Sequence, residues 1–322
     1  MSLPAEFALI ARHFRPLAGA GALDLLDDAA VLDLPPGRRL VIAADAMVEG
    51  VHYLPDDPPE TVGRKLLRVN LSDMAAMGAV PLGYLMTTAF SRGIADSWIA
   101  GFAQGLAEDQ DAFGVTVLGG DTAVTPGPTC LSLTILGTVA PDAVLRRVGA
   151  RAGDDIWVSG TIGDGLLGLR VLRGEVPADA EGHLARRYRL PQPRLALGQA
   201  IATVAHAGLD VSDGLVQDLG HLCRAAGCGA EIAAAEVPLS PAARALLARD
   251  AALLPALLTG GDDYELLFTA APDAAAAVRD AAATAGIPVR RIGRMLAGPT
   301  EVVARDASGA VLDVARGGWS HF

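Results

Sequence analysis

Short apolar runs of strand length alternate with segments of helical spacing through both halves of this chain. Strands joined through helices build helix-covered sheets, so this alternation constrains the fold more than any single motif and predicts a mixed α/β (α+β) architecture. We predict strands over residues 40–44, 81–90, 115–118, 129–139, 156–159, 230–233, 264–269 and 289–294. We predict helices over residues 5–14, 58–77, 97–113, 163–173, 194–207, 214–226 and 273–285.

The chain is long enough for two domains. Its 322 residues exceed the roughly 100–200 residues of a typical domain. A charged, glycine-bearing segment at residues 146–153 separates the two alternating halves. We therefore predict an N-terminal sheet-and-helix domain over residues 1–148 and a C-terminal α/β domain over residues 149–322. Aromatic residues make up only 4% of the chain, so Ala, Val, Leu and Ile are expected to fill both cores.

The charge of the chain excludes whole classes of partner. With 26 basic and 37 acidic residues, the net charge is −11, whereas a general binder of nucleic acid or anionic membranes needs a positive surface. Lys65 is the only lysine, and it lies between Arg64 and Leu66. The chain therefore lacks a Walker A loop, which requires Gly-Lys-Ser/Thr, and has a single candidate for Schiff-base chemistry.

Cysteine usage and the uncharged stretches indicate a cytoplasmic protein. The chain has three cysteines, Cys130, Cys223 and Cys228. An odd, sparse set favours a reducing compartment over a disulfide framework. Glu6, Arg12 and Arg15 occupy the place of the apolar core of a secretion signal. The uncharged stretches 74–91 and 122–141 contain Gly and Pro, and the second also alternates with a period of two, so we expect no membrane span.

Aspartates recur where apolar runs end, several of them beside glycine. The series comprises Asp27, Asp28, Asp45, Asp73, Asp121, Asp210, Asp213, Asp262 and Asp263. A single aspartate is usually a turn former or a helix cap. A series is different, because gathered carboxylates repel one another unless a cation lies among them, and oxygen-rich sites that also bind phosphate select Mg²⁺. The series therefore predicts that several Mg²⁺ ions let this acidic protein bind a nucleotide such as ATP.

Three other motifs carry less specific functional signals. Gly163-x-Gly165-x-x-Gly168 matches the dinucleotide-binding pattern, but residues 178–187 do not resemble the strand that would carry the ribose-binding acid. We interpret it as a turn that packs a helix on a strand, with nicotinamide binding as an alternative. Ser212 lacks the first glycine of the esterase motif Gly-x-Ser-x-Gly, so it is a candidate helix cap or ligand contact. For His52, a structural and a binding role both stay open.

Six short blocks occur in a characteristic order. They are Asp27-Asp28-Ala29-Ala30-Val31-Leu32, Asp45 with Glu49-Gly50-Val51-His52, residues 70–79, Gly119-Gly120-Asp121-Thr122, Ser212-Asp213-Gly214-Leu215 with Asp218-Leu219, and residues 260–266. With these blocks in this order, the chain resembles the thiamine-monophosphate kinases from about residue 5 to Phe322. The blocks at residues 70–79 and 260–266 are the most specific.

The resemblance implies an activity, a fold and a set of site residues. The activity is ATP-dependent phosphorylation of thiamine monophosphate to thiamine diphosphate by direct transfer, with ATP as co-substrate and several Mg²⁺ ions. The fold is that of aminoimidazole ribonucleotide synthetase, as a homodimer formed through N-terminal domains that also bind ATP and Mg²⁺. The implied metal ligands are Asp28, Asp45, Asp73, Asp121, Asp210 and Asp213, with Asp73, Asp121 and Asp213 assigned to catalysis. The implied ATP contacts are Gly120, Asp121, Arg147 and Ser212, and the implied substrate contacts are His52, Asp262 and Trp319.

Two departures from the family pattern concern the metal site. Ala43 and Ala44 replace the hydroxyl residues that usually precede the aspartate matching Asp45, and Leu26 replaces a glycine before the aspartate pair. The alternatives are another ATP-dependent enzyme of this fold, or a Mg-nucleotide-binding protein without kinase activity. Selenophosphate synthetases need an N-terminal Cys or selenocysteine and a Lys, and the hydrogenase-maturation member needs a C-terminal Cys. This chain has no Cys before Cys130 and ends in Trp319-Ser320-His321-Phe322.

Overall fold

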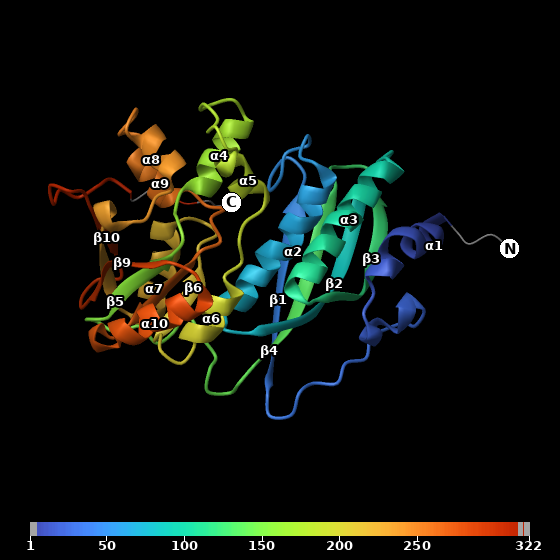
Figure 1. Cartoon of the computed structure of the whole chain (residues 1–322), viewed down its shortest axis with the longest axis horizontal. Helices are drawn as coiled ribbons and strands as arrows, with labels where there is room; N and C mark the ends of the chain where they lie inside the picture. Colours follow the sequence, from blue (N-terminus) through green and yellow to red (C-terminus); the bar gives the residue numbers. More distant parts are fainter. Residues whose placement is uncertain (1–4, 315–317, 319–322) are drawn as a thin grey trace. The chain divides into compact units, whose positions relative to one another are not determined.

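The computed structural model describes residues 5–314 and residue 318 (Figure 1). The chain divides into two compact units, each with its own sheet and helices. Unit 1 comprises Met1–Met74 and Val80–Pro141, and unit 2 comprises Ala75–Ala79 and Asp142–Phe322. The predicted mixed α/β architecture in two parts is confirmed. Within the described residues, none of the helices has the length and apolar character needed to cross a bilayer.

Unit 1 contains a four-stranded sheet in the order β1-β4-β2-β3. Its strands are β1 (Arg39–Val48), β2 (Val80–Ser91), β3 (Thr116–Thr125) and β4 (Cys130–Val139). Its helices and turns are α1 (Ala5–Leu9), the π-helical η1 (Ile10–Phe14), the 3-10 turns η2 (Arg15–Leu17) and η3 (Ala20–Leu25), α2 (Pro59–Ala76) and α3 (Asp96–Phe113). The parallel strands β2 and β3 are joined through α3, and β4 runs antiparallel to β1 and β2.

Helices α2 and α3 lie side by side along one face of this sheet (Figure 1). Two glycines allow their backbones to approach: a Cβ at Gly105 would lie 2.0 Å from the carbonyl oxygen of Glu60, and one at Gly63 would lie 2.3 Å from that of Phe102. Asp109 of α3 is fully buried and accepts hydrogen bonds from the Arg64 and Arg68 guanidinium groups of α2. These contacts fix the two helices in one register.

The two faces of the unit 1 sheet differ in burial. Side chains directed toward the helices are buried, among them Tyr84, Met86, Phe90, Leu131, Leu133 and Ile135. The alternate residues of the strands point away from the helices. We call this side the open face, and its exposed apolar residues are Leu40, Ile42, Ala44, Ala46, Leu85 and Ala123. With Ile42 59% exposed, the open face is an apolar surface of the kind that marks an interaction site.

Unit 2 contains a six-stranded sheet in the order β10-β7-β9-β5-β8-β6, antiparallel except for β10 and β7. Its strands are β5 (Asp155–Ser159), β6 (Ala207–Asp210), β7 (Gly229–Ala233), β8 (Leu266–Ala270), β9 (Val289–Leu296) and β10 (Val302–Arg305). Its helices are α4 (Asp164–Leu172), α5 (His183–Arg189), α6 (Leu195–Ile201), α7 (Leu215–Ala226), α8 (Pro241–Leu247), α9 (Leu253–Thr259) and α10 (Ala275–Ala285), with the 3-10 turns η4 (Ala234–Glu236) and η5 (Pro272–Ala274).

Three apolar clusters hold unit 2 together. On one face of the sheet, Leu219 and Leu222 of α7 pack against strand residues such as Ile156. On the other face, α6 and α10 cover Trp157 and Phe268. A separate small cluster joins α4, α5, α8 and α9. As the composition predicts, most of these core residues are aliphatic.

Two strands of unit 1 continue beyond their predicted ends. The sequence predicted that apolar strands stop at Asp45 and just before Asp121, but β1 continues to Val48 and β3 to Thr125. Both are edge strands, where one side of the backbone and many side chains meet water. An aspartate can therefore lie inside such a strand without being buried among apolar neighbours.

Other differences arise where elements are short. The helix predicted over residues 194–207 ends at Ile201, because the chain turns there and enters β6 at Ala207. Strand β6 was not predicted, since the helix was expected to continue to residue 207, where β6 begins. The short helices α5, α8 and α9 and the strand β10 were also missed. Residues 5–14 form α1 followed by a π-helical turn rather than one regular helix.

Candidate active site

The segment after β6 carries three predicted site residues of unit 2. Asp210 is the last residue of β6 and is 7% exposed, and the partly exposed Ser212 and Asp213 follow directly. Gly214 precedes α7 with φ +125°, and a Cβ there would lie 2.4 Å from the carbonyl oxygen of Thr259. The glycine is needed for this sharp passage from strand to helix.

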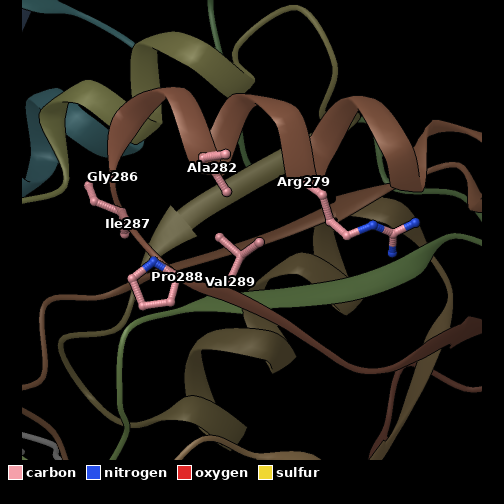
Figure 2. A pocket seen from close by; sticks show the side chains of 7 residues that line it. Arg279, Ala282, Gly286, Ile287, Pro288 and Val289 are labelled. Atoms are coloured by element: carbon pink, nitrogen blue, oxygen red, sulfur yellow. The ribbon is translucent and has the colours of Figure 1, made fainter.

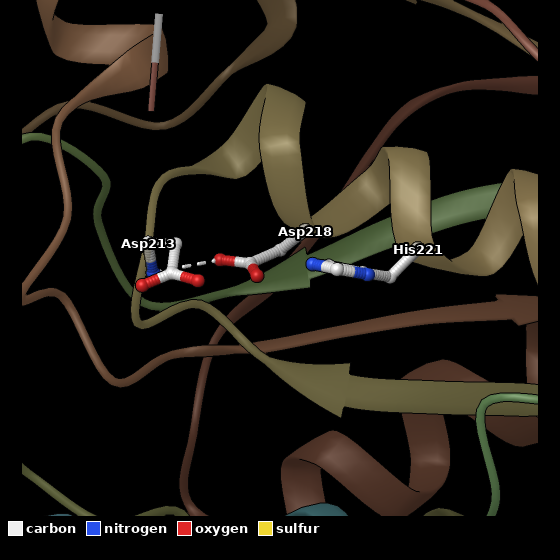
Figure 3. Close-up of side chains that lie close together, drawn as sticks. All are labelled: Asp213, Asp218 and His221. Atoms are coloured by element: carbon white, nitrogen blue, oxygen red, sulfur yellow. Dashed lines mark hydrogen bonds between the residues drawn. The ribbon is translucent and has the colours of Figure 1, made fainter. Parts of the chain in front are cut away.

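Asp218 of α7 lies beside Asp213 and supports this segment (Figure 3). Its Oδ2 accepts the backbone N–H groups of Asp213 at 3.0 Å and Gly214 at 3.1 Å. Asp218 is 3% exposed; burial raises its pKa to about 7, and the charges of Asp210 and Asp213 add to the effect. The sequence analysis placed Asp218 in one of the family blocks but assigned it no role. The charges of Asp210 and Asp213 beside the buried Asp218 form a place where a cation would relieve repulsion.

His221 lies one turn further along α7, and its ring points toward Asp218 in Figure 3. Ligand atoms of Asp213, Asp218 and His221 lie within 4.8 Å of one another. Arg224 donates to Nδ1 of His221 at 3.0 Å, so that nitrogen is occupied. Burial, then the charges of Arg224 and Arg147, lower the pKa of His221. The His221 ring thus lies beside the two carboxylates. The carboxylate oxygens of Asp213 and Asp218 are the kind of ligand that Mg²⁺ prefers.

The loop 260–264 places Asp262 beside Ser212. The backbone N–H of Asp262 donates to the carbonyl oxygen of Ser212 at 2.9 Å, and the N–H of Tyr264 donates to that of Val211 at 2.8 Å. Asp262 itself is partly exposed. Four predicted site residues, Asp210, Ser212, Asp213 and Asp262, are thus brought together in unit 2 by segments 50 residues apart in the sequence.

The other acids of the 260–266 block belong to the interior. Asp263 accepts the backbone N–H groups of Gly163 and Gly165, and Glu265 is paired with the guanidinium groups of Arg187 and Arg194. The glycines of the G-x-G-x-x-G pattern therefore pack α4 against this loop, as the turn interpretation predicted. Since Asp263 occupies the N–H groups that a pyrophosphate would need, the nicotinamide alternative loses its support.

Arg147 lies in the exposed segment that leads into unit 2. The carbonyl oxygen of its neighbour Arg146 accepts the N–H of Gly208 in β6 at 2.9 Å, which anchors the segment on the same strand that ends in Asp210. The positive charge of Arg147 also reaches His221. Arg147 therefore stands near the Asp210–Asp218 group.

Unit 1 links the backbone of Asp45 to α2, which carries Asp73, through a residue that the sequence analysis did not single out. The side-chain oxygen of Asn70 accepts the backbone N–H of Asp45 at 3.1 Å, and its Nδ2 donates to Leu66. Asp73 follows Asn70 by three residues on α2, so both lie on one side of that helix. The place of Asn70 in the most specific block, three residues before an aspartate, was a signal that could have identified it.

His52 is held in one orientation after β1. The N–H of Val48 donates to its Nδ1 at 3.0 Å, so the neutral imidazole carries its proton on Nε2. The lysine Lys65 of α2 donates to the carbonyl oxygen of His52 at 3.0 Å. The only lysine of the chain is 2% exposed and thus anchors the His52 loop.

Asp121 lies on a different face from Asp45. The register across the sheet aligns Asp45 with Leu133, Met86 and Gly120, which places Asp121, one residue on, on the open face. With two strands between them, β1 and β3 are about 14 Å apart. Gly120 has φ +157°, and a Cβ there would lie 1.8 Å from the carbonyl oxygen of Met86. Unit 1 alone therefore does not gather Asp45 and Asp121 at one point.

Of the last two predicted residues, the structure describes one. Asp28 is exposed in a bend at residues 27–29. Trp319 lies outside the described residues, so its predicted substrate contact stays a prediction.

Unit 2 has two hollows away from the candidate site. One, of about 270 Å³, is bordered by α10 and the turn after it, with Ala282, Ile287 and Val289 in its wall (Figure 2). The other, of about 940 Å³, is rich in arginine, including Arg291 and Arg294, which share the carboxylate of Asp155. Among the residues that the structure describes, no predicted site residue lines either hollow.

Comparisons with known proteins identify the family of this chain. The model of the AIR synthase related protein N-terminal domain matches residues 26–139, and that of the AIR synthase related protein C-terminal domain matches residues 151–306. A thiamine-monophosphate kinase of Caulobacter vibrioides is 46% identical over 99% of this chain and 91% of its own length. The chain belongs to the thiamine-monophosphate kinase family.

Solved structures of this family share the fold. The crystal structure of thiamine-monophosphate kinase from Stenotrophomonas maltophilia K279a matches with a TM-score of 0.83 and 40% identity, covering 97% of this chain and 99% of that one. A structure of AaThiL complexed with AMPPCP and TMP matches with a TM-score of 0.78 and 29% identity, covering 96% and 98%. The two-domain fold implied by the resemblance is therefore confirmed.

Proposed function

We propose that this chain phosphorylates thiamine monophosphate to thiamine diphosphate by direct transfer of the γ-phosphoryl group of ATP. The observation that carries the proposal is the match to a thiamine-monophosphate kinase over 99% of the chain at 46% identity. The AaThiL structure, complexed with AMPPCP and TMP, supports a ternary complex of enzyme, nucleotide and substrate. Such a complex suits direct transfer, in which positioning and charge stabilisation supply most of the catalysis.

We propose several Mg²⁺ ions as the cofactor. The fit rests on the donor set: burial raises the pKa of Asp218, and the neighbouring charges of Asp210 and Asp213 raise it further. Bound Mg²⁺ supplies the charge neutralisation that lets phosphate oxygens approach these carboxylates. We assign the ligand roles to Asp28, Asp45, Asp73, Asp121, Asp210 and Asp213, with Asp73, Asp121 and Asp213 the most important for turnover. Residues Ala43 and Ala44 offer no side-chain oxygen to a metal ion. The backbone of Asp45 is held in place by its hydrogen bond to Asn70.

The remaining roles follow from chemistry and position. Arg147 binds a phosphate of ATP as a fixed cation, and Ser212 and Gly120 line the nucleotide. His52 donates its Nε2 proton to a phosphate oxygen of the substrate, which its hydrogen-bonded Nδ1 favours. Asp262 pairs with the cationic or amino-bearing rings of thiamine monophosphate, on which Trp319 stacks. In these roles residues 1–148 supply metal, nucleotide and dimer contacts, and residues 149–322 complete the binding of both substrates.

We also propose a homodimer formed through the open face of unit 1. This face exposes Leu40, Ile42 and Leu85 together with small residues, the composition of a surface that packs against a second copy. Asp121 lies on it, so the second copy would cover the metal ligand of this strand. The proposed compartment is the cytoplasm, since the cysteines are unpaired.

Incubation of the purified chain with ATP, Mg²⁺ and thiamine monophosphate tests the activity. We expect thiamine diphosphate and ADP in equal amounts, and a rate that rises further when Mg²⁺ is raised well above the ATP concentration. A rate that follows Mg-ATP alone would contradict the additional ions. A folded protein that binds ATP but forms no thiamine diphosphate would favour the alternative, a nucleotide-binding protein without kinase activity.

A further inference from the structure

Asp263 is the buried acid of the 260–264 loop, and the proposed reaction gives it no role. Its side chain has no exposed surface. One carboxylate oxygen accepts the N–H of Gly163 at 2.8 Å, and the other accepts the N–H of Gly165 at 3.0 Å. Arg187 of α5 donates to its backbone carbonyl oxygen at 3.0 Å. Three hydrogen bonds thus attach this one residue to α4 and α5.

The residues on either side of Asp263 have an unusual backbone. Asp262 has φ +69° and Tyr264 has φ +52°, values in the left-handed region that residues with a side chain rarely adopt. Such a conformation persists only where the surroundings hold it. The side-chain bonds of Asp263, lying between the two, are the local contacts suited to hold it.

The backbone of Asp262 is enclosed on two sides. On one side, a Cβ at Gly165 would lie 2.3 Å from the carbonyl oxygen of Asp262. On the other, the N–H of Asp262 donates to Ser212 at 2.9 Å. A Cβ at Gly261 would lie 2.2 Å from the same Ser212 oxygen. The direction in which Asp262 presents its side chain is therefore set by how α4 is attached to the loop.

We propose that Asp263 is a positioning residue for substrate recognition: through Gly163 and Gly165 it holds the loop in the conformation that presents Asp262 to thiamine monophosphate. The inference rests on the proposed function, in which Asp262 contacts this substrate. Asp263 acts through Asp262, since both of its carboxylate oxygens are directed to the backbone of α4.

The test compares Asp263→Ala, Asp262→Ala and the double variant, with KM measured separately for thiamine monophosphate and for ATP. We expect Asp263→Ala to raise KM for thiamine monophosphate tenfold or more and to change KM for ATP by less than twofold. The double variant should be no worse than Asp262→Ala, because the two residues act in series. Asp263→Asn keeps one acceptor and should give an intermediate KM.

A second variant tests the contact between α4 and the 260–264 loop without removing a carboxylate. Gly165→Ala would push against the carbonyl oxygen of Asp262, and we expect the same selective rise in KM for thiamine monophosphate. The matched control is Gly220→Ala in α7, where the new Cβ would meet only the flexible end of Arg224, at 3.1 Å. Thermal unfolding confirms which variants are folded; if Asp263→Ala is not, Gly165→Ala and Asp263→Asn decide.

Three outcomes overturn the positioning role: an unchanged KM for thiamine monophosphate, equal rises in both KM values, or additive effects in the double variant. Each is distinguishable from failure of the proposed function. If the wild-type chain forms no thiamine diphosphate, the function itself is wrong. If the wild type is active and the variants show one of the three outcomes, only the positioning role is wrong.

Discussion

Acidic residues that look alike in the sequence differ sharply in what surrounds them. Asp109, Asp164, Asp263 and Glu265 are fully buried, and each accepts at least two hydrogen bonds from other residues. Asp28, Asp45 and Asp121 keep exposed side chains. A buried carboxylate must be satisfied by the protein itself, whereas an exposed one is accessible to a ligand. The exposed acids are therefore accessible to a cation with its phosphate.

Removing one proposed metal ligand should stop turnover and leave the fold intact. For Asp73→Asn and Asp213→Asn we expect kcat to fall by roughly a hundredfold or more, because the amide keeps the shape but loses the charge that binds Mg²⁺. Steady-state rates at saturating substrates and thermal unfolding measure the two effects. Asp111→Asn, on the exposed side of α3, is the control. Near-normal rates in both variants would remove these residues from the metal site.

Cysteine reactivity tests burial in the core of unit 2. Burial raises the pKa of Cys223 to about 11 and also raises that of Cys228. The thiolate is the reactive form, so at pH 8 only about one Cys223 in a thousand is ionised, a fraction that grows as the pH rises. In the native protein we expect iodoacetamide to label the less buried Cys130 well before the other two, as mass spectrometry would show. Equal labelling of all three would contradict this core.

At the scale of elements, edge strands and close helix pairs explain where the fold departs from local pattern. β1 and β3 carry aspartates within their length because they are at the edges of the sheet. α2 and α3 approach closely because Gly63 and Gly105 lack side chains. The helix pair positions Asn70 and Asp73, so its rigidity matters for the site.

The ion pairs between α2 and α3 should therefore contribute unequally to stability. Asp109→Asn leaves the buried Arg68 without its partner charge, and we expect a loss of about 3–5 kcal/mol in the free energy of unfolding. Its neighbour Glu108 also contacts Arg64, but it is well exposed, so Glu108→Gln should change stability by less than about 1 kcal/mol. Urea unfolding measures both. Similar losses in the two variants would mean that the helix pair does not depend on the buried charge.

At the scale of the whole molecule, a chain of net charge −11 binds two anionic substrates, and an apolar sheet face lies exposed. A single chain by itself accounts for neither feature. The proposed Mg²⁺ ions would account for the first feature, and the proposed homodimer would account for the second. Since Asp121 lies on the open face, association and catalysis should be linked.

A charge on the open face should separate the copies. For Ile42→Asp we expect the mass in solution to fall from twice the chain's 32.9 kDa to that of one chain, with a loss of activity, because a buried unpaired charge strongly opposes association. Light scattering coupled to gel filtration measures the mass. Val311→Asp, at an equally exposed position in unit 2, should leave it unchanged. A dimeric Ile42→Asp variant would place the interface elsewhere.

The sequence by itself determined the mixed α/β architecture, the order of most strands and helices, the family and the set of candidate aspartates, because periodicity and short motifs are local properties. The tertiary structure decided which acids face solvent and which are buried. Asp262 and Asp263 are adjacent in sequence and differ in what packs against them. It also brought Ser212 beside Asp262 and Asn70 beside Asp45, and placed Asp121 on the opposite face from Asp45. Contacts between residues far apart in the chain depend on strand register and helix packing, which local sequence does not encode.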